Sequence, residues 1–173
     1  MIAKVVAYIK GISLRNVVTN LLVFGLGYLL IHTYQTWDVP KGKAPTLAGM
    51  TLNDNQYLAL DAMPKPVLVH FWATWCKICQ FEHASIKRIA EDYPVISVAS
   101  QSGSATAVKK FMQEQELTFP VIMDADGKVF KQWGGVGFPT SFVINKENEI
   151  AFAEAGFTTE WGLRLRLFLA SHF

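Results

Sequence analysis

The chain is 173 residues long, with 51% apolar residues, 17% charged residues and two cysteines. This length suits one ordinary domain with a short appendage, and the apolar fraction excludes an intrinsically disordered chain. A net charge of +2 is too small to indicate nucleic-acid binding by itself. Residues 1–36 carry three of the 16 basic residues and none of the 14 acidic ones, so this head is +3 and the remainder −1. The two parts are therefore predicted to lie in different environments.

Residues 1–36 are predicted to be a membrane anchor that stays attached to the body of the protein. The stretch 17–34 has no formal charge, and its 18 residues would rise about 27 Å as a helix, close to the roughly 30 Å of a bilayer core. A cleaved signal peptide is the alternative, but its apolar run is normally shorter, and no pair of small residues follows at cleavage spacing. Because the positive end should stay in the cytoplasm, we expect the body to be exported.

A polar tether over residues 37–45, broken by two prolines and a glycine, leads to a predicted domain over residues 46–173. In chain order, the pattern predicts a hairpin over 47–60, a buried strand over 67–73, a helix over 76–92, a strand over 95–99, a helix over 105–115 capped by Ser104, strands over 121–123, 140–144 and 149–154, and a helix from Thr158 or Thr159 to residue 170. This order indicates an α/β fold in which helices flank a mixed central sheet.

The two cysteines form a Cys-x-x-Cys motif, Cys76 and Cys79, at the junction between the strand over 67–73 and the following helix. The same motif is half of a zinc site, but a structural zinc site needs four ligands, and His83 would supply only a third. In the first turn of a helix, unpaired N–H groups and the helix dipole stabilise a thiolate. Because side chains at i and i+3 are neighbours, the two sulfurs can close a disulfide. The motif therefore favours a redox-active pair.

Helix geometry predicts different roles for the two sulfurs. Cys76 lies at the helix tip, so its sulfur should be exposed and attack the disulfide of a protein partner. Cys79 should be the shielded thiol that resolves the mixed disulfide, because it falls on the stripe expected to face the core: Cys79, Glu82, Ile86, Ile89 and Tyr93. Run in reverse, the pair would oxidise a dithiol, and no cofactor besides the disulfide is expected.

The stretch Val69 to Cys79 resembles the active site of thioredoxin-fold proteins. Its segment 71–76, Phe-Trp-Ala-Thr-Trp-Cys, is most similar to the membrane-anchored TlpA/ResA group of bacterial thiol–disulfide oxidoreductases. Within that group, the short anchored chain looks closest to the ScsD-type proteins, named for suppression of copper sensitivity. The resemblance covers roughly residues 46–173. It implies a thioredoxin fold, an inner-membrane anchor formed by one transmembrane helix, a periplasmic domain, and electrons supplied by a membrane thiol-transfer protein.

The loop over residues 134–140, Gly-Gly-Val-Gly-Phe-Pro-Thr, is similar to the loop that carries a cis-proline in this family. The resemblance implies that Pro139 is that cis residue, and that Phe138 offers backbone polar groups to a bound peptide. The alternative is an ordinary loop, because most X–Pro bonds are trans. Trp75 is also expected at the substrate-binding surface, while Trp72 and Trp133 are expected to pack in the protein rather than to enclose a cofactor.

Three further residues are candidates for tuning the cysteine pair. Lys77 would favour the thiolate by its charge, or is a simple surface lysine. Glu82 resembles an acidic residue near the active site of ResA-like proteins and is expected to shuttle the Cys79 proton, or is a carboxylate at the rim. His70 stands where thioredoxin has a buried aspartate. It could accept the Cys79 proton when neutral, stabilise a thiolate when charged, or be a hydrogen-bonded core residue.

Two other functions stay open at this point. Thiolates suit copper(I), so Cys76 and Cys79, with or without His83, could form a copper(I)-binding module. The second is a non-catalytic interaction domain that keeps the motif. No phosphate-binding glycine motif and no nucleic-acid-binding patch is visible in the sequence, so neither nucleotides nor nucleic acids are expected partners.

Overall fold

The computed structural model describes residues 13–35 and 42–172. The chain divides into two units, Met1–Gln35 and Thr36–Phe173, and each is described by itself. In the first unit, helix α2 spans Leu14–Gln35 and includes the uncharged stretch 17–34. Over the described ranges, no helix has both the length and the apolar character needed to cross a membrane. Residues 1–12 and 36 of the predicted anchor, 37–41 of the predicted tether and 173 of the predicted domain lie outside the described residues.

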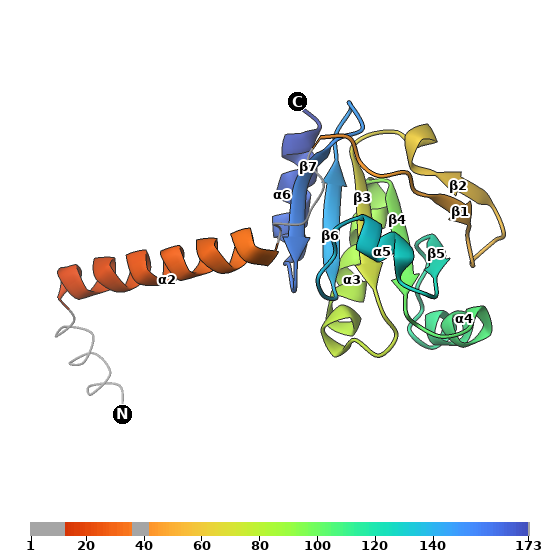
Figure 1. The fold of residues 1–173 in the computed structure, drawn as a ribbon, viewed down its shortest axis with the longest axis horizontal. Coiled ribbons are helices and arrows are strands. Elements are labelled where there is room, and N and C mark those ends of the chain that lie inside the picture. The colour runs from red at the N-terminus through yellow and green to blue at the C-terminus, as the bar shows by residue number, and fades with distance from the viewer. Residues whose placement is uncertain (1–12, 36–41, 173) are drawn as a thin grey trace. The chain divides into compact units, whose positions relative to one another are not determined.

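The second unit is built on a five-stranded sheet with the strand order β5-β4-β3-β6-β7 (Figure 1). Strand β3 lies at the centre, parallel to β4 and antiparallel to β6, so the sheet is mixed as predicted. A separate antiparallel hairpin precedes it, formed by β1 (Ala48–Met50) and β2 (Tyr57–Ala59). The five strands of the main sheet are β3 (Val67–Trp72), β4 (Val95–Ser100), β5 (Val121–Asp124), β6 (Thr140–Ile144) and β7 (Ile150–Ala155).

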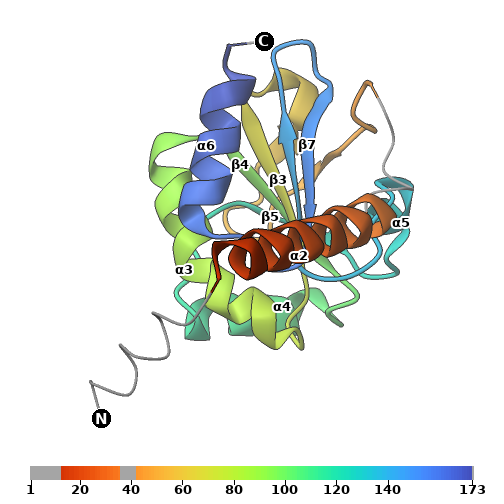
Figure 2. The same cartoon turned by 90° about the vertical axis from the view of Figure 1, so that its left-hand side faces the viewer.

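Helices cover both faces of this sheet. Helices α3 (Lys77–Asp92) and α6 (Glu160–Ala170) lie side by side on one face (Figure 2), and α4 (Ala105–Glu114) contributes to the same core. Helix α5 (Lys128–Gln132) and the β1–β2 hairpin contribute to the core on the other face.

All six residues of β3 are buried, and alternate residues serve the two cores. Leu68 and Trp72 pack with α3, α4 and α6, whereas Val67, Val69 and Phe71 pack with α5 and the hairpin. His70 lies between Leu68 and Trp72 on the same face of the sheet, because side chains alternate along a strand. This face, which points toward α3, therefore carries a histidine where an apolar residue would be usual.

In the second unit, the predicted strands and helices are confirmed with their ends shifted by no more than two residues, but two elements were not predicted. These are α5 and the 3-10 helix η1 (Leu60–Ala62). Helix α5 is too short to show a helical period in the sequence. It begins because the Asp124 carboxylate, at the end of β5, accepts hydrogen bonds from the backbone N–H groups of Val129 and Phe130, each at 3.0 Å.

Candidate active site

The two cysteines lie where β3 gives way to α3, as the sequence predicts. Cys76 is the N-cap residue of α3, Cys79 lies in its first turn, and a disulfide joins them. The Cys79 N–H donates a hydrogen bond to the Cys76 sulfur at 3.1 Å. The first N–H groups of a helix have no partner within the helix. A backbone donor of this kind therefore faces the sulfur that is expected to carry negative charge in the reduced pair.

The exposure of Cys76 differs from the prediction. Its sulfur was expected to be exposed, but the residue is only 6% exposed, and Cys79 is fully buried. The disulfide explains the difference, because it bonds the Cys76 sulfur to a buried partner and turns it toward the backbone of α3. The order of accessibility is still the predicted one. Exposed surface next to the pair comes instead from Trp75, which is 61% exposed, and from Ile78.

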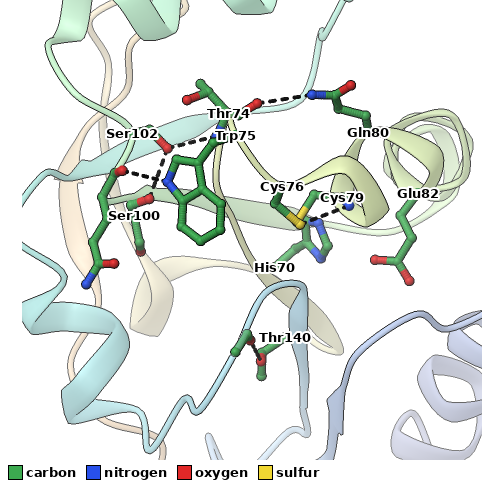
Figure 3. The surroundings of a disulfide bond; sticks show 12 residues. His70, Thr74, Trp75, Cys76, Cys79, Gln80, Glu82, Ser100, Ser102 and Thr140 are labelled. Atoms are coloured by element: carbon green, nitrogen blue, oxygen red, sulfur yellow. Dashed lines mark hydrogen bonds between the residues drawn. A yellow bond between two sulfur atoms is a disulfide. The ribbon is translucent and has the colours of Figure 1, made fainter.

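Side chains from α3 and from the loop after β4 hold the segment before Cys76 (Figure 3). The Thr74 N–H donates to the Ser102 hydroxyl at 3.0 Å, and the Gln80 side-chain amide donates to the Thr74 carbonyl at 3.1 Å. The Trp75 ring N–H donates to the Gln101 carbonyl at 3.0 Å. These contacts fix the backbone that leads into the helix. Gln80 and Ser102 were not predicted as part of the site, since neither belongs to a recognisable motif.

The loop that precedes β6 contains the residues expected to receive a substrate. The Phe138–Pro139 peptide bond is cis, which confirms that part of the prediction. The Phe138 ring stacks on Phe130 with 4.3 Å between ring centroids, and it forms a T-shaped pair with Trp75 at a centroid distance of 5.6 Å. Gly135 permits this arrangement, because a Cβ atom at that position would overlap the Phe130 ring. The loop and the exposed Trp75 therefore form one surface, whose role in substrate binding stays a prediction.

Glu82 lies one turn after Cys79 on the buried side of α3. It is 1% exposed, so it is not a carboxylate at the rim of the site. One carboxylate oxygen accepts a hydrogen bond from the Thr158 N–H, and the other oxygen has no hydrogen-bond partner among the described residues. Burial raises the pKa of Glu82 to about 7, although the bond from Thr158 acts in the opposite direction. A carboxyl group with this pKa can take up or release a proton near neutral pH.

His70 is fully buried in β3, and its ring points toward the disulfide (Figure 3). Ring atom Nδ1 lies 2.9 Å from the Ser141 hydroxyl, and Nε2 has no hydrogen-bond partner in the described part of the chain. Burial, with nearby His83 as a smaller cause, lowers the pKa of His70 to about 3. The ring is therefore neutral at physiological pH, which disfavours the hypothesis of a charged imidazolium. Proton transfer by the neutral ring stays a prediction.

The remaining candidates occupy very different places. Lys77 is exposed as predicted, and its effect on the thiolate stays a prediction. His83 is 3% exposed and lies in an aromatic box, with its ring centroid 5.0 Å from Trp72, 5.9 Å from Phe111 and 6.1 Å from Phe119. Burial lowers the pKa of His83 to about 4. Within residues 13–35 and 42–172, no three or more His, Cys, Asp or Glu side chains are arranged to hold a metal ion.

Comparisons with known proteins find a family, relatives and a solved structure that are similar to this chain. Residues 38–153 match the AhpC/TSA family. A thioredoxin-like protein of Haemophilus influenzae is 34% identical over 110 residues, which cover 63% of this chain and 65% of that protein. The thiol-disulfide oxidoreductase ResA of Bacillus thuringiensis is 29% identical over 143 residues, covering 79% of this chain and 83% of the relative.

A solved structure extends the comparison. The pneumococcal exposed lipoprotein thioredoxin Etrx1 of Streptococcus pneumoniae aligns with a TM-score of 0.66 and 26% identity, over 72% of this chain and 99% of that chain. The predicted thioredoxin fold and the resemblance to ResA-like proteins are therefore confirmed. The narrower likeness to ScsD-type proteins stays a prediction.

We expect Glu82→Gln to change how stability depends on pH. The pKa of Glu82 is about 7 in the folded chain against an ordinary value of 4.5, so between these values the folded state binds more protons than the unfolded state. The contribution of Glu82 to the free energy of unfolding therefore falls as the pH rises from 4.5 to about 7. Urea unfolding across this range should show the variant gaining stability relative to the wild type as pH rises. Glu91→Gln, an exposed position on the same helix, should show no such trend. A constant difference for Glu82→Gln at every pH would mean that the carboxyl has its ordinary pKa.

Proposed function

We propose that this chain, which belongs to the AhpC/TSA family, is a membrane-anchored thiol–disulfide oxidoreductase that exchanges disulfides with protein partners in the periplasm. The observation that carries the proposal is the Cys76–Cys79 disulfide at the N-terminus of α3, directly after the central strand of the sheet. A relative named as a thiol-disulfide oxidoreductase supports the same activity for this chain. The substrates we propose are therefore protein thiols and disulfides.

In the reducing direction, the reaction begins with both cysteines reduced. The Cys76 thiolate attacks one sulfur of a partner disulfide, so that a mixed disulfide forms while the other partner sulfur leaves as a thiolate. Cys79 then loses its proton and attacks the Cys76 sulfur. This second step forms the Cys76–Cys79 disulfide and releases the remaining partner sulfur as a thiolate. Two electrons pass from the pair to the partner, and the two released thiolates take up protons from Cys79 and from solvent.

The surroundings of the pair supply what each step needs. The Cys79 N–H stabilises negative charge on the Cys76 sulfur, which favours the first attack. Glu82, whose pKa is about 7, is suited to accept the Cys79 proton before the second attack. The exposed Trp75 and the loop of Phe138 and Pro139 offer a surface where the backbone of a partner can lie.

The anchor and the compartment are part of the same proposal. The uncharged stretch 17–34 and the positive charge before it support an anchor with an exported domain. The similarity to a protein described as an exposed lipoprotein thioredoxin agrees with export. Thiols oxidise readily in such a compartment. Reduction of partners there would need electrons from across the membrane, and we propose a membrane thiol-transfer protein as their source.

We expect Cys79→Ser to trap mixed disulfides between Cys76 and partner proteins, because the thiol that resolves them is gone. The adducts should be visible on non-reducing gels of cells that express the full chain, and should disappear on reduction. Cys76→Ser is the matched control and should give no adducts.

The alternative hypothesis of a copper(I)-binding module predicts the opposite result. If Cys79→Ser traps nothing while the purified wild-type chain binds copper(I) stoichiometrically, the two cysteines form a metal site and the proposed exchange reaction is wrong.

We expect the full chain to remain in the membrane pellet after alkaline extraction, because we propose that residues 1–36, which include the uncharged stretch 17–34, anchor it in the bilayer. Leu22→Lys combined with Leu26→Lys is a suitable control, since each charge costs about 3 kcal/mol at the centre of a membrane helix and should release the protein. A wild-type protein found in the supernatant, or a mature chain that begins after residue 30, would refute the anchor.

A further inference from the structure

Two serines flank His70 in the sheet, and they make different contacts. Ser97 on β4 and Ser141 on β6 are its direct neighbours across the strands, and both are buried. The Ser97 hydroxyl accepts a hydrogen bond from the Trp72 ring N–H at 3.2 Å and donates to the Pro120 carbonyl at 2.9 Å. The Ser141 hydroxyl lies 2.9 Å from Nδ1 of His70. Ser141 therefore holds the histidine, whereas Ser97 does not.

The bond at Nδ1 fixes the orientation of the His70 ring, which lies beside the disulfide (Figure 3), and leaves Nε2 as the remaining ring nitrogen. Nε2 is buried and has no hydrogen-bond partner among residues 13–35 and 42–172. A buried polar nitrogen without a partner destabilises a folded protein, and native structures seldom contain one without a reason. In the disulfide, neither sulfur can carry a proton or a full negative charge. After reduction, Cys79 becomes a thiol or a thiolate, and either can bond to an imidazole nitrogen.

We propose that Ser141 is a positioning residue that holds the His70 ring so that Nε2 meets the Cys79 sulfur when the pair is reduced. The inference rests on the proposed function, because only a pair that cycles between disulfide and dithiol creates this partner for Nε2.

The hydrogen-bond pattern also assigns the tautomer of His70. We infer that the Ser141 hydroxyl donates and Nδ1 accepts, because Nδ1 is the acceptor that the described residues offer to this buried hydroxyl. A neutral ring then carries its proton on Nε2, which makes Nε2 a donor toward the Cys79 thiolate. The proton that Cys79 loses goes to Glu82 or to solvent, and His70 stays neutral. In this tautomer, His70 stabilises the thiolate that attacks the Cys76 sulfur, in place of the predicted transfer of the Cys79 proton to the ring.

The other groups around His70 determine how a pH profile is interpreted. Helix α3 contributes Glu82 and His83 on the cysteine side, and burial lowers the pKa of His83 to about 4, so it is neutral like His70. Strand β4 contributes only the hydroxyl of Ser97 next to His70. On β7, Glu154 is the strand neighbour of Ser141 and forms an ion pair with Arg166 at 2.6 Å. Glu82, whose pKa burial raises to about 7, takes up or releases a proton near neutral pH, so its titration contributes to the profile.

Reaction of the reduced full chain, in detergent micelles, with an aromatic disulfide that releases a coloured thiolate separates the two steps. The first equivalent of colour reports attack by Cys76, and its rate depends on the reagent concentration. The second equivalent reports resolution of the mixed disulfide by Cys79, and its rate does not depend on that concentration. We expect Ser141→Ala to slow the second release about fivefold near neutral pH, the effect of losing one hydrogen bond. The pH midpoint of that release should move upward by about 0.7 unit, and the first release should change less than about twofold.

Four variants distinguish a positioning role of Ser141 from a role in packing alone. Ser97→Ala removes an equally buried hydroxyl at the same level of the sheet and should leave the second release unchanged. Ser141→Thr keeps the hydroxyl and should recover most of the rate. His70→Asn should slow the second release by itself. Adding Ser141→Ala to His70→Asn should then have no further effect, because the serine acts through the histidine.

The outcomes also separate this inference from the proposed function. If Ser141→Ala changes neither the rate nor the pH midpoint of the second release, or adds to the effect of His70→Asn, the positioning role is wrong and the exchange reaction still stands. Equal slowing by Ser97→Ala and Ser141→Ala would likewise show that only packing was disturbed. If the wild-type chain releases no second equivalent, the proposed function itself is wrong.

Discussion

The hydrogen bond from the Cys79 N–H to the Cys76 sulfur requires Cys76 to be the N-cap residue of α3. The central strand β3 meets this requirement, because it is buried along its whole length and ends shortly before Cys76. The apolar stripe of α3 then fixes the direction of the helix against the sheet. Because β6 runs antiparallel to β3, β6 begins at the end of the sheet where β3 stops. The loop that carries Pro139 leads into β6 at that end. The cysteine pair and the candidate substrate surface are thus consequences of one strand pairing.

Around this pair, the protein keeps three titratable side chains out of water. His70, Glu82 and His83 are all nearly or fully buried, and each has at least one polar atom without a hydrogen-bond partner in the described residues. Apolar residues at these positions would make a more stable core. Their concentration beside Cys79 is what a site that moves protons during exchange would require.

Much of this arrangement could be predicted from the sequence because it depends on local patterns. The apolar run of β3, the Cys-x-x-Cys motif and the stripe of α3 are all short-range features, and the cis bond before Pro139 followed from a family resemblance. The predicted exposure of Cys76 was wrong because the prediction considered a lone thiol at a helix tip, whereas the Cys76 sulfur forms a disulfide with the buried Cys79. Helix α5 was missed because a carboxylate from a strand starts it. The contact between His70 and Ser141 depends on strand register over 71 residues of sequence, which no local pattern encodes.

The most direct test of the central claim is a redox titration of the full chain against thiol–disulfide buffers, with the reduced fraction measured by the mass added on alkylation. We expect a reversible two-electron curve whose midpoint lies between about −270 mV, typical of a reductant like thioredoxin, and about −120 mV, typical of a strong oxidant. A pair that stays oxidised until the potential falls below about −300 mV would be a structural disulfide, and the chain would then not be a thiol–disulfide oxidoreductase.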